Sequence, residues 1–189
     1  MRDIWWEKHR PATLDGFMGQ ENIVEEIQLI LEGKAPMQHF LFSSSEPGTG
    51  KTTLAYIIAE VLGWQLHKFN ASSKKTRGIE FIEEHRLTPQ AQDALKGVIE
   101  GAQGYFILTC NDISKVSPWL QSRCQVRTFE PIPAELVEQR LATVAAQEGV
   151  EVDSHAIKVI AKKHGGDLRN SIGALQKAAY LEPKSLRKF

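Results

Sequence analysis

The residues best suited to chemistry form one short stretch, Ser45-Glu46-Pro47-Gly48-Thr49-Gly50-Lys51-Thr52-Thr53. Glycines let successive backbone N–H groups turn inward around phosphate oxygens, and a helix N-terminus adds partial positive charge at the same place. Lys51 has the reach to contact β- and γ-phosphates, and Thr52 can place its hydroxyl on Mg²⁺. The stretch predicts a site for a nucleoside triphosphate with Mg²⁺. The predicted phosphate-binding residues are Pro47, Gly48, Thr49, Gly50, Lys51, Thr52 and Thr53.

This motif departs from the full phosphate-loop pattern at one position. The first glycine of G-x-x-x-x-G-K-[ST] would fall at Ser45, where serine can enter the turn at modest cost. The alternative interpretation is a turn rich in glycine and proline, followed by a helix with a solvated lysine. Gly-Lys-Thr-Thr between a predicted strand and a predicted helix favours the phosphate-binding interpretation.

The segments around the motif predict a parallel α/β domain. An apolar run from His39 to Phe42 reads as the strand before the loop, and residues 52–62 read as the helix after it. Tyr105 to Cys110 is a continuous apolar run of the kind found in buried parallel strands. Further strands are predicted at 65–70 and 126–129, and further helices at 21–32 and 88–100.

The composition changes at Glu130-Pro131-Ile132-Pro133, where two prolines indicate a linker. Beyond it the apolar residues recur only at helical spacing, with Gly149 and Gly165 as stops and Asp153 and Asp167 as caps. The sequence thus predicts an α/β domain over residues 1–130, with the phosphate loop on a parallel sheet, and a small three-helix domain over residues 131–189.

Composition narrows the class of protein. The chain has 189 residues, 42% hydrophobic and 24% charged, which suits a soluble globular protein with one full domain and one small one. Its formal net charge is +0, so any contact with nucleic acid must come from a local patch. The two cysteines, Cys110 and Cys124, lack metal-ligand spacing and fit a reducing cytosol. No apolar run has transmembrane length and the N-terminus lacks a secretory signal, so we expect a cytoplasmic protein.

Further motifs follow one another in a fixed order along the chain. Besides the phosphate loop they are Trp6-Glu7-Lys8-His9-Arg10-Pro11, Gly19-Gln20, Asn70-Ala71-Ser72, Arg77-Gly78-Ile79, Leu87-Thr88-x-x-Ala91-Gln92-x-Ala94-Leu95, Cys110-Asn111, Ser122-Arg123-Cys124 and Gly166-Asp167-Leu168-Arg169. In this order they resemble the AAA+ ATPases, and within them the clamp-loader small subunits of the replication factor C type, archaeal or phage-like. The resemblance covers essentially the whole chain. It implies a P-loop AAA+ parallel-sheet domain with a helical lid, and ATP/ADP and Mg²⁺ as cofactors.

The resemblance implies catalytic roles for three residues. Asn111 takes the sensor-1 position, with an amide for the γ-phosphate or the attacking water; otherwise it is a loop residue that caps a turn. Arg169 takes the sensor-2 position, which folds the lid onto the γ-phosphate; otherwise it is a solvated helix arginine. Arg123 takes the position of an arginine finger, which reaches the nucleotide of a neighbouring subunit. Without a partner subunit Arg123 would be an ordinary surface residue.

The resemblance also implies an adenine pocket near the N-terminus. Its residues would be His9, Arg10 and Pro11, together with Gly19 and Gln20. The two tryptophans in this segment can instead simply pack it onto the core, and for both of them that simpler interpretation stands beside the functional one.

One element of the family is not evident. A P-loop ATPase needs an apolar strand that ends in acidic residues, which hold Mg²⁺ and polarise the attacking water; in the family it stands immediately before the Leu-Thr-x-x-Ala-Gln segment. In one interpretation residues 79–84 are a degenerate form of this strand, with Glu83 and Glu84 as the acids. In the other, residues 77–84 match an earlier helix of the family, and the strand is missing from the given sequence or truly deleted between His85 and Arg86. The order of motifs favours the second, although it would leave a gap in the sheet.

A basic cluster is the candidate DNA contact. Between Gln65 and Ile79 the sequence has four fixed positive charges and no acid, which suits contacts with phosphates; a solvated loop is the alternative. The resemblance places Arg77 and Lys96 near helix ends that track the DNA backbone. It implies as partners primer–template DNA without sequence preference, a sliding clamp, a large subunit and copies of this chain. The predicted DNA-binding residues are Lys74, Lys75, Arg77 and Lys96.

The resulting prediction is an ATP-binding subunit of a sliding-clamp loader in a prokaryotic, archaeal or phage-infected cell. The leading alternative is a nucleotide-binding assembly subunit without ATPase activity, which lends Arg123 to a catalytic neighbour. A third candidate is another AAA+ DNA remodeller, such as a branch-migration motor; Ser122-Arg123-Cys124 and the N-terminal segment argue against it by resemblance. The family's ring-forming collar domain is not found after the lid, which puts ring formation by the given chain alone in doubt.

Overall fold

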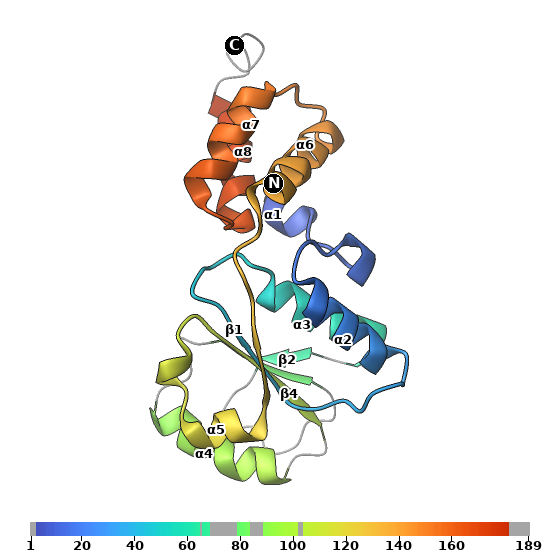
Figure 1. Ribbon diagram of the computed structural model, residues 1–189, viewed down its shortest axis with the longest axis vertical. Coiled ribbons are helices and arrows are strands. Elements are labelled where there is room, and N and C mark those ends of the chain that lie inside the picture. The colour runs from blue at the N-terminus through green and yellow to red at the C-terminus, as the bar shows by residue number, and fades with distance from the viewer. Residues whose placement is uncertain (1–2, 65, 69–78, 84–88, 102–103, 182–189) are drawn as a thin grey trace. The chain divides into compact units, whose positions relative to one another are not determined.

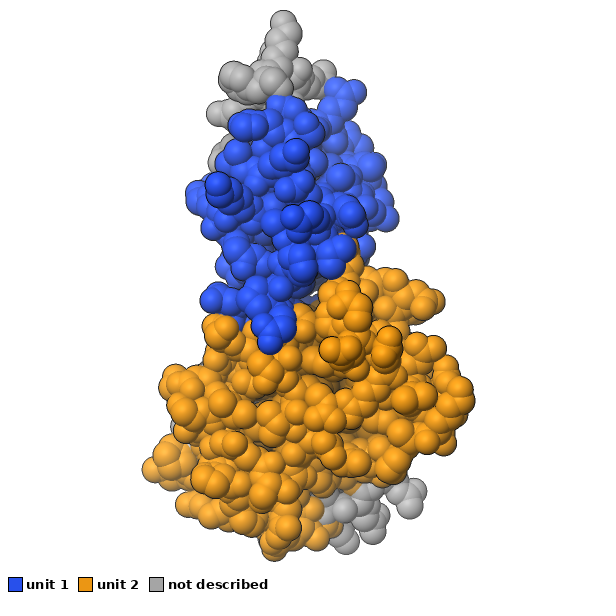
Figure 2. All heavy atoms as spheres, in the orientation of Figure 1, with its two compact units in different colours: residues 1–10, 46–49, 130–189 blue, residues 11–45, 50–129 orange. Residues whose placement is uncertain are grey.

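The computed structural model describes residues 3–64, 66–68, 79–83, 89–101 and 104–181, with the backbone alone for 66–68, 79–83, 91 and 181 (Figure 1). The chain divides into two compact units (Figure 2). The sheet unit comprises residues 11–45 and 50–129, and the helical unit comprises residues 1–10, 46–49 and 130–189. The sequence-based division placed residues 1–10 with the sheet. In the structure they group with the helices, because Trp5 and Trp6 pack in the helical core.

The sheet unit is built on a five-stranded parallel sheet. Its strands are β1 (Phe40–Ser43), β2 (Leu66–Lys68), β3 (Ile79–Glu83), β4 (Tyr105–Cys110) and β5 (Gln125–Thr128), in the order β2-β3-β4-β1-β5. Each neighbouring pair is parallel. Every residue of β1 is buried, as in a central strand that is covered on both faces. The predicted fold, a parallel α/β sheet of the P-loop type, is confirmed.

β3 corrects the prediction for residues 77–84. The favoured interpretation made this segment a helix and left the family's acidic strand absent. Instead, Ile79–Glu83 pairs with β4 on one side and β2 on the other, with Ile79 opposite Tyr105 and Glu83 opposite Thr109. A strand is preferred here because an empty place beside β4 would leave backbone groups of the core unpaired. Residues 79–83 are therefore a strand, as the first interpretation has them, whereas the acidic role of Glu83 stays a prediction and Glu84 lies outside the described residues.

Helices cover both faces of the sheet (Figure 1). On one face α2 (Glu21–Leu31) and α3 (Lys51–Val61) pack with Phe40 and Phe42. On the other face α4 (Pro89–Gly101) and α5 (Pro118–Arg123) pack with Leu41 and Leu108. Residues of β1 enter the two cores alternately because successive side chains of a strand point to opposite faces. In the described connections lie the short 3-10 helices η1 (Leu14–Gly16) and η3 (Ile113–Lys115).

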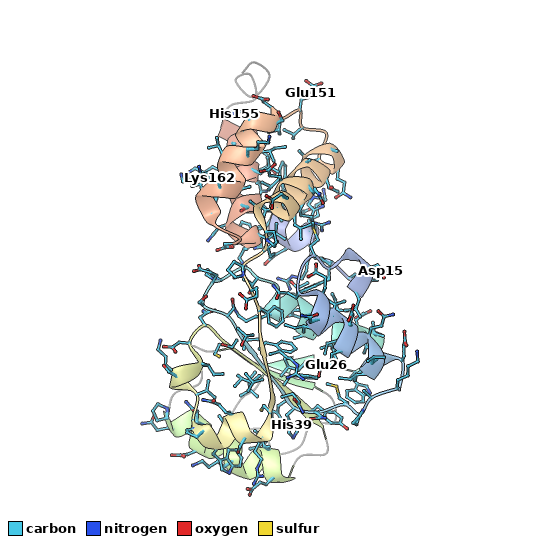
Figure 3. The ribbon with its side chains drawn as sticks, viewed as in Figure 1. Asp15, Glu26, His39, Glu151, His155 and Lys162 are labelled. Carbon is cyan, nitrogen blue, oxygen red and sulfur yellow. The ribbon has the colours of Figure 1, made fainter. Side chains whose placement is uncertain are left out.

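An ion pair joins α2 to the edge strand β5. Nε and NH2 of Arg127 both donate to the carboxylate of Glu26, which projects from α2 (Figure 3). The side chain of Arg127 is 28% exposed and that of Glu26 is 31% exposed. The hydrogen bonds that Arg127 donates to Glu26 raise the pKa of Arg127, so the guanidinium stays charged in the folded protein.

We expect Glu26→Gln to lower the free energy of unfolding by about 1 kcal/mol, because a two-point pair that is partly buried is stronger than an ordinary surface pair. Urea unfolding measures this value. Glu25→Gln, at an exposed position of the same helix, is the matched control. Equal unfolding free energies for the two variants would contradict the prediction.

The helical unit has a core of its own. Its helices are α1 (Trp5–Lys8), α6 (Ala134–Gln147), α7 (Ser154–His164) and α8 (Leu168–Leu181). The predicted caps are confirmed, since Asp153 accepts from His155 N and Asp167 accepts from Asn170 N. Gly165 ends α7 in the left-handed conformation. The buried core residues are Trp5, Ile132, Val137, Leu141, Val144, Ala145, Ile157, Ala161, Ile172 and Leu175.

Cys110 and Cys124 form no disulfide bond and pack in the core on the α4 and α5 side of the sheet. Cys110 is buried, and burial raises the pKa of the Cys124 thiol to about 12, so that it stays protonated. In the part of the chain that the structure describes, no helix combines the length and the apolar character needed to cross a membrane.

Candidate nucleotide-binding site

The predicted phosphate loop connects the carboxyl end of β1 to α3. Gly48 and Gly50 have φ angles of 71° and 103°, which other residues rarely adopt. A Cβ at Gly50 would lie 2.5 Å from the ring of Phe17, so glycine is required there for space as well. α3 begins directly afterwards, at Lys51. The sequence thus folds into the strand, glycine turn and helix N-terminus on which phosphate binding by this motif depends.

The residues of the loop fit a phosphate group. The first intrahelical hydrogen bond of α3 runs from Leu54 N to Gly50 O, so the N–H groups before it have no intrahelical acceptor. The Thr49 hydroxyl is buried and has no hydrogen-bond partner among the described residues. Lys51 is only 8% exposed and brings a cation to the same turn. Such an array of donors suits an anionic ligand with several oxygen atoms.

The predicted magnesium ligand, Thr52, is half-buried in the first turn of α3. Among the described side chains, no three histidine, cysteine or acidic groups gather as a metal site. Glu83, which the sequence offers as an acid for the metal, pairs through its backbone opposite Thr109 of β4. When bound, Mg²⁺ would neutralise phosphate charge beside the Thr52 hydroxyl.

Asn111 lies at the edge of the sheet where the loop begins. It follows β4, and its neighbour Cys110 accepts a hydrogen bond of 3.2 Å from Ser44 N. The Asn111 side chain is exposed. Ligands of parallel α/β sheets bind beyond the carboxyl ends of the strands. The structure therefore brings the predicted sensor-1 residue, the start of the loop and the end of β3 to one edge of the sheet.

Two glutamines hold the segment that leads from Asn111 to α5. Gln92 on α4 is 6% exposed; its Oε1 accepts from Ser117 N at 2.7 Å and its Nε2 donates to Lys115 O at 2.9 Å. Gln121 Nε2 donates to two further carbonyls of the segment, at 3.1 and 2.8 Å. In the sequence Gln92 is recognisable only as part of a motif. Its position one helical turn before the core residue Leu95 places it on the buried face of α4, where an amide needs hydrogen-bond partners, and this could have indicated a structural role.

Arg123, the predicted arginine finger, is the last residue of α5 and is exposed. Its guanidinium lies over the ring of Trp119, 5.4 Å from the ring centroid. An arginine on an aromatic face keeps its planar group ordered while leaving its donors accessible. The side chain is therefore presented at the surface of the sheet unit.

The motif that contains Arg169 begins α8. Asp167 caps the helix and is 6% exposed. It also lies against the phosphate loop, because a Cβ at Gly48 would lie 1.9 Å from Asp167 Oδ1. Arg169 is exposed in the first turn of α8, two residues beyond this contact. The predicted sensor-2 motif thus adjoins the loop at Gly48, whereas the role of Arg169 itself stays a prediction.

The predicted adenine-binding residues fall into two groups. His9 and Arg10 belong to the helical unit, where the His9 ring hydrogen-bonds Glu148 Oε1 at 2.5 Å. Pro11, Gly19 and Gln20 belong to the sheet unit, and the last two have positive φ angles just before α2. Their contact with adenine stays a prediction.

The predicted DNA-binding residues are only partly described. Lys96 on α4 is half-exposed and pairs with Asp93 Oδ1 at 2.7 Å. Lys74, Lys75 and Arg77 lie outside the described residues, as do the motif Asn70-Ala71-Ser72 and the start of the motif at Leu87.

The contacts of Glu148 with Lys8 and His9 predict that the stability of the protein depends on pH. Hydrogen bonds from Lys8 and also from His9 hold the pKa of Glu148 below its ordinary value of 4.5. A lowered carboxyl pKa adds stability above the ordinary pKa, and that stability is lost as the pH falls through the folded-state pKa. We therefore expect Glu148→Gln to be less stable than the wild type at neutral pH, with the difference disappearing as the pH falls below 4.5. Thermal unfolding of both proteins across this range measures it, and a difference independent of pH would contradict it.

The class of protein follows from comparison with known families. The family model described as the Holliday junction DNA helicase RuvB P-loop domain matches residues 9–108, more than half of the chain. The matched residues include the phosphate loop and most of β4. The chain therefore belongs to this family of AAA+ P-loop domains, which are nucleotide-binding domains.

Comparison with curated relatives identifies the proteins within this class that the chain resembles. The replication factor C small subunits of Archaeoglobus fulgidus and Thermofilum pendens are 33% and 34% identical to this chain over 206 residues, which include 94% of it. These residues make up 64% and 63% of the two relatives, so the chain spans less than two thirds of their length. Over nearly its whole length the chain is therefore similar to the replication factor C small subunits. The aligned span exceeds the 189 residues of the whole chain, so the relatives have residues within it that this chain lacks.

Solved structures support the same fold. The RuvB Holliday junction branch migration motor of Thermotoga maritima matches with a TM-score of 0.79 at 26% identity, over 92% of this chain and 66% of that one. A variant of the same motor gives a TM-score of 0.81 at 25% identity, over 93% of this chain and 67% of that one.

Proposed function

We propose that this chain is an ATP-binding subunit of a sliding-clamp loader, which uses ATP binding and hydrolysis to load a polymerase processivity clamp onto primer–template DNA. The observation that carries the proposal is the phosphate loop, with its buried Thr49 hydroxyl, unpartnered among the described residues, and its buried Lys51 at a helix N-terminus. The relatives' name, replication factor C small subunit, directs the proposal toward clamp loaders. Because the chain spans only part of those relatives, the activity, substrates and partners of the whole protein all belong to the proposal.

In the proposed mechanism the loop holds the triphosphate. Backbone N–H groups of the glycine turn and the Lys51 ammonium would contact the β- and γ-phosphates, and the Thr52 hydroxyl would help to hold Mg²⁺. Asn111 orients the γ-phosphate or the attacking water, and Arg169 approaches the γ-phosphate. Arg123 serves the nucleotide of the next subunit. These groups act by positioning and by neutralising charge on the transferring phosphoryl group, which is most of what catalysis in this class requires.

The proposed partners follow from the same role. ATP-bound subunits would assemble with a large subunit and with copies of this chain, open the clamp and grip primer–template DNA, in the cytoplasm of a prokaryotic, archaeal or phage-infected cell. The proposed DNA contacts go to backbone phosphates, so they confer no sequence preference.

A subunit that binds nucleotide without hydrolysing it is the second candidate. It is favoured by the residues that the relatives have and this chain lacks. If those residues include the family's acidic strand, β3 fills its place in the sheet without supplying the same acids. Such a subunit would still lend Arg123 to a neighbour.

A branch-migration motor is the third candidate, favoured by the family model and by the solved structures. The curated replication factor C relatives reach 35% identity, against 26% for the motor, which ranks clamp loading first.

One experiment separates the three. ATP turnover is measured with the large subunit present, first alone, then with primer–template DNA and clamp, and then with a four-way DNA junction. Stimulation by primer–template DNA and clamp is the expected result. ATP binding without turnover would favour the assembly subunit, stimulation by the junction alone would favour the motor, and absence of ATP binding would contradict all three.

A further inference from the structure

Residues 3–10, which we call the arm, are fixed to the helical unit at several points. Trp5 is 3% exposed, and its backbone N–H donates to Gln176 Oε1 at 3.2 Å. Gln176 Nε2 in turn donates to Asp3 O at 2.8 Å. Trp6 lies against Gly173, where a Cβ would come within 3.3 Å of its ring. The start of the arm is therefore held by α8 through backbone hydrogen bonds and aromatic packing.

The end of the arm is held by α6. Glu148 follows the last residue of α6, and its Oε1 contacts both Lys8 Nζ at 2.7 Å and His9 Nε2 at 2.5 Å. The side chains of His9 and Glu148 are 9% and 13% exposed, so this contact is largely shielded from water. An ionised carboxylate can only accept hydrogen bonds, so His9 Nε2 carries the proton.

A second group of α6 fixes the backbone at the same residue. Arg140 NH2 donates to the carbonyl oxygen of His9. Glu148 thus fixes the ring of His9, and Arg140 fixes the peptide unit that joins His9 to Arg10. Hydrogen bonds to charged groups are the strong ones, and two of them on one residue restrict both its side chain and its backbone.

We propose that Glu148 and Arg140 are positioning residues for the base of the nucleotide, because they fix His9 and Arg10 in the orientation that receives it. This inference rests on the proposed function as an ATP-binding subunit, together with the predicted contact of His9 and Arg10 with adenine. A binding segment that is rigid before the ligand arrives loses less entropy on binding, so its supports contribute to affinity without touching the ligand. Glu148 and Arg140 should therefore affect the affinity for the base and not for the phosphates, because their contacts are with the arm rather than with the phosphate loop.

The test compares two ligands, ATP and inorganic tripolyphosphate, by isothermal titration calorimetry. Tripolyphosphate presents the same phosphates without a base. Glu148→Ala should weaken ATP binding by about tenfold, the scale of one hydrogen bond to a charged group, and leave tripolyphosphate binding unchanged. Glu148→Gln keeps an acceptor and should give a smaller loss. Glu135→Ala, at an exposed position in the first turn of α6, is the matched control and should bind both ligands like the wild type.

Each outcome decides the matter. If Glu148→Ala weakens both ligands equally, or neither, the inference is wrong, and the contact serves only to hold the arm in place. If Glu148→Ala does not fold, Glu148→Gln supplies the same comparison. Failure of the wild-type chain to bind either ligand would instead overturn the proposed function. Wild-type binding of tripolyphosphate and ATP with equal affinity would remove the base contact on which the inference rests.

Discussion

Replacing Arg123 by alanine is expected to lower ATP turnover of the assembled complex by about a thousandfold, at the lower end of the range for arginine fingers, with ATP affinity of the isolated chain unchanged. Arg123 is exposed at the end of α5, with its guanidinium 5.4 Å from the centre of the Trp119 ring. A planar cation presented at the surface in this way can neutralise charge on a neighbour's transferring phosphoryl group. Turnover of the assembled complex and calorimetry of the isolated chain measure the two quantities.

Mixing two variants tests whether Arg123 acts on its own nucleotide or on a neighbour's. At an ATP concentration too low to fill the weakened site, subunits with Lys51→Ala keep Arg123 but stay largely empty, whereas subunits with Arg123→Ala hold nucleotide but lack the arginine. A mixture should recover turnover wherever an intact Arg123 faces an occupied site, although neither variant is active alone. If the mixture is as inactive as each variant alone, Arg123 acts on the nucleotide of its own subunit. If the Arg123→Ala complex turns over ATP like the wild type, Arg123 has no catalytic role.

Lys51→Ala should weaken ATP binding by about a hundredfold, or ~3 kcal/mol, which is the scale of a charge-assisted hydrogen bond in a site shielded from water. Lys51 is 8% exposed and begins α3 directly after Gly50, so its charge adds to that of the helix N-terminus. Fluorescence titration with a labelled ATP analogue measures the affinity.

The control for this variant is Lys34→Ala. Lys34 is 66% exposed and pairs with the nearby Glu32 at 2.6 Å, so its removal should leave ATP affinity as it is. An unchanged affinity in Lys51→Ala would contradict the proposed function outright. An equal loss of affinity in both variants would indicate a general effect of charge rather than an interaction in the loop.

Much of the site could be predicted because its determinants are local. The glycine turn needs positive φ angles at Gly48 and Gly50, and that demand is visible in the residues themselves. β1 and β4 lie in the middle of a covered sheet, so their sequences are continuous apolar runs that need no further context. The caps Asp153 and Asp167 were likewise visible, because a capping side chain acts within three residues of its own position.

The incorrect or open predictions concern segments whose structure depends on contacts with residues far away in the sequence. Ile79, Phe81 and Ile82 have a spacing that suits a helix or a strand, and only pairing with β4, more than twenty residues away, selects the strand. The packing of Trp5 and Trp6 could not be assigned either. Their partners, Gln176 and Gly173, lie near the other end of the sequence, and a lone glutamine or glycine on a helix gives no sign of what it will contact.

The grouping of residues 1–10 with residues 130–189 means that the sheet unit is an insertion within the helical unit. Fluorescent reporters placed near the two ends of the described chain, at Asp3 and Lys177, would therefore both sit on the helical unit. Their separation would stay constant during any movement of the sheet unit, and the pair would give a false picture of a rigid protein. A reporter pair that detects such movement needs one member on the sheet unit, for which the exposed Glu25 of α2 is suitable.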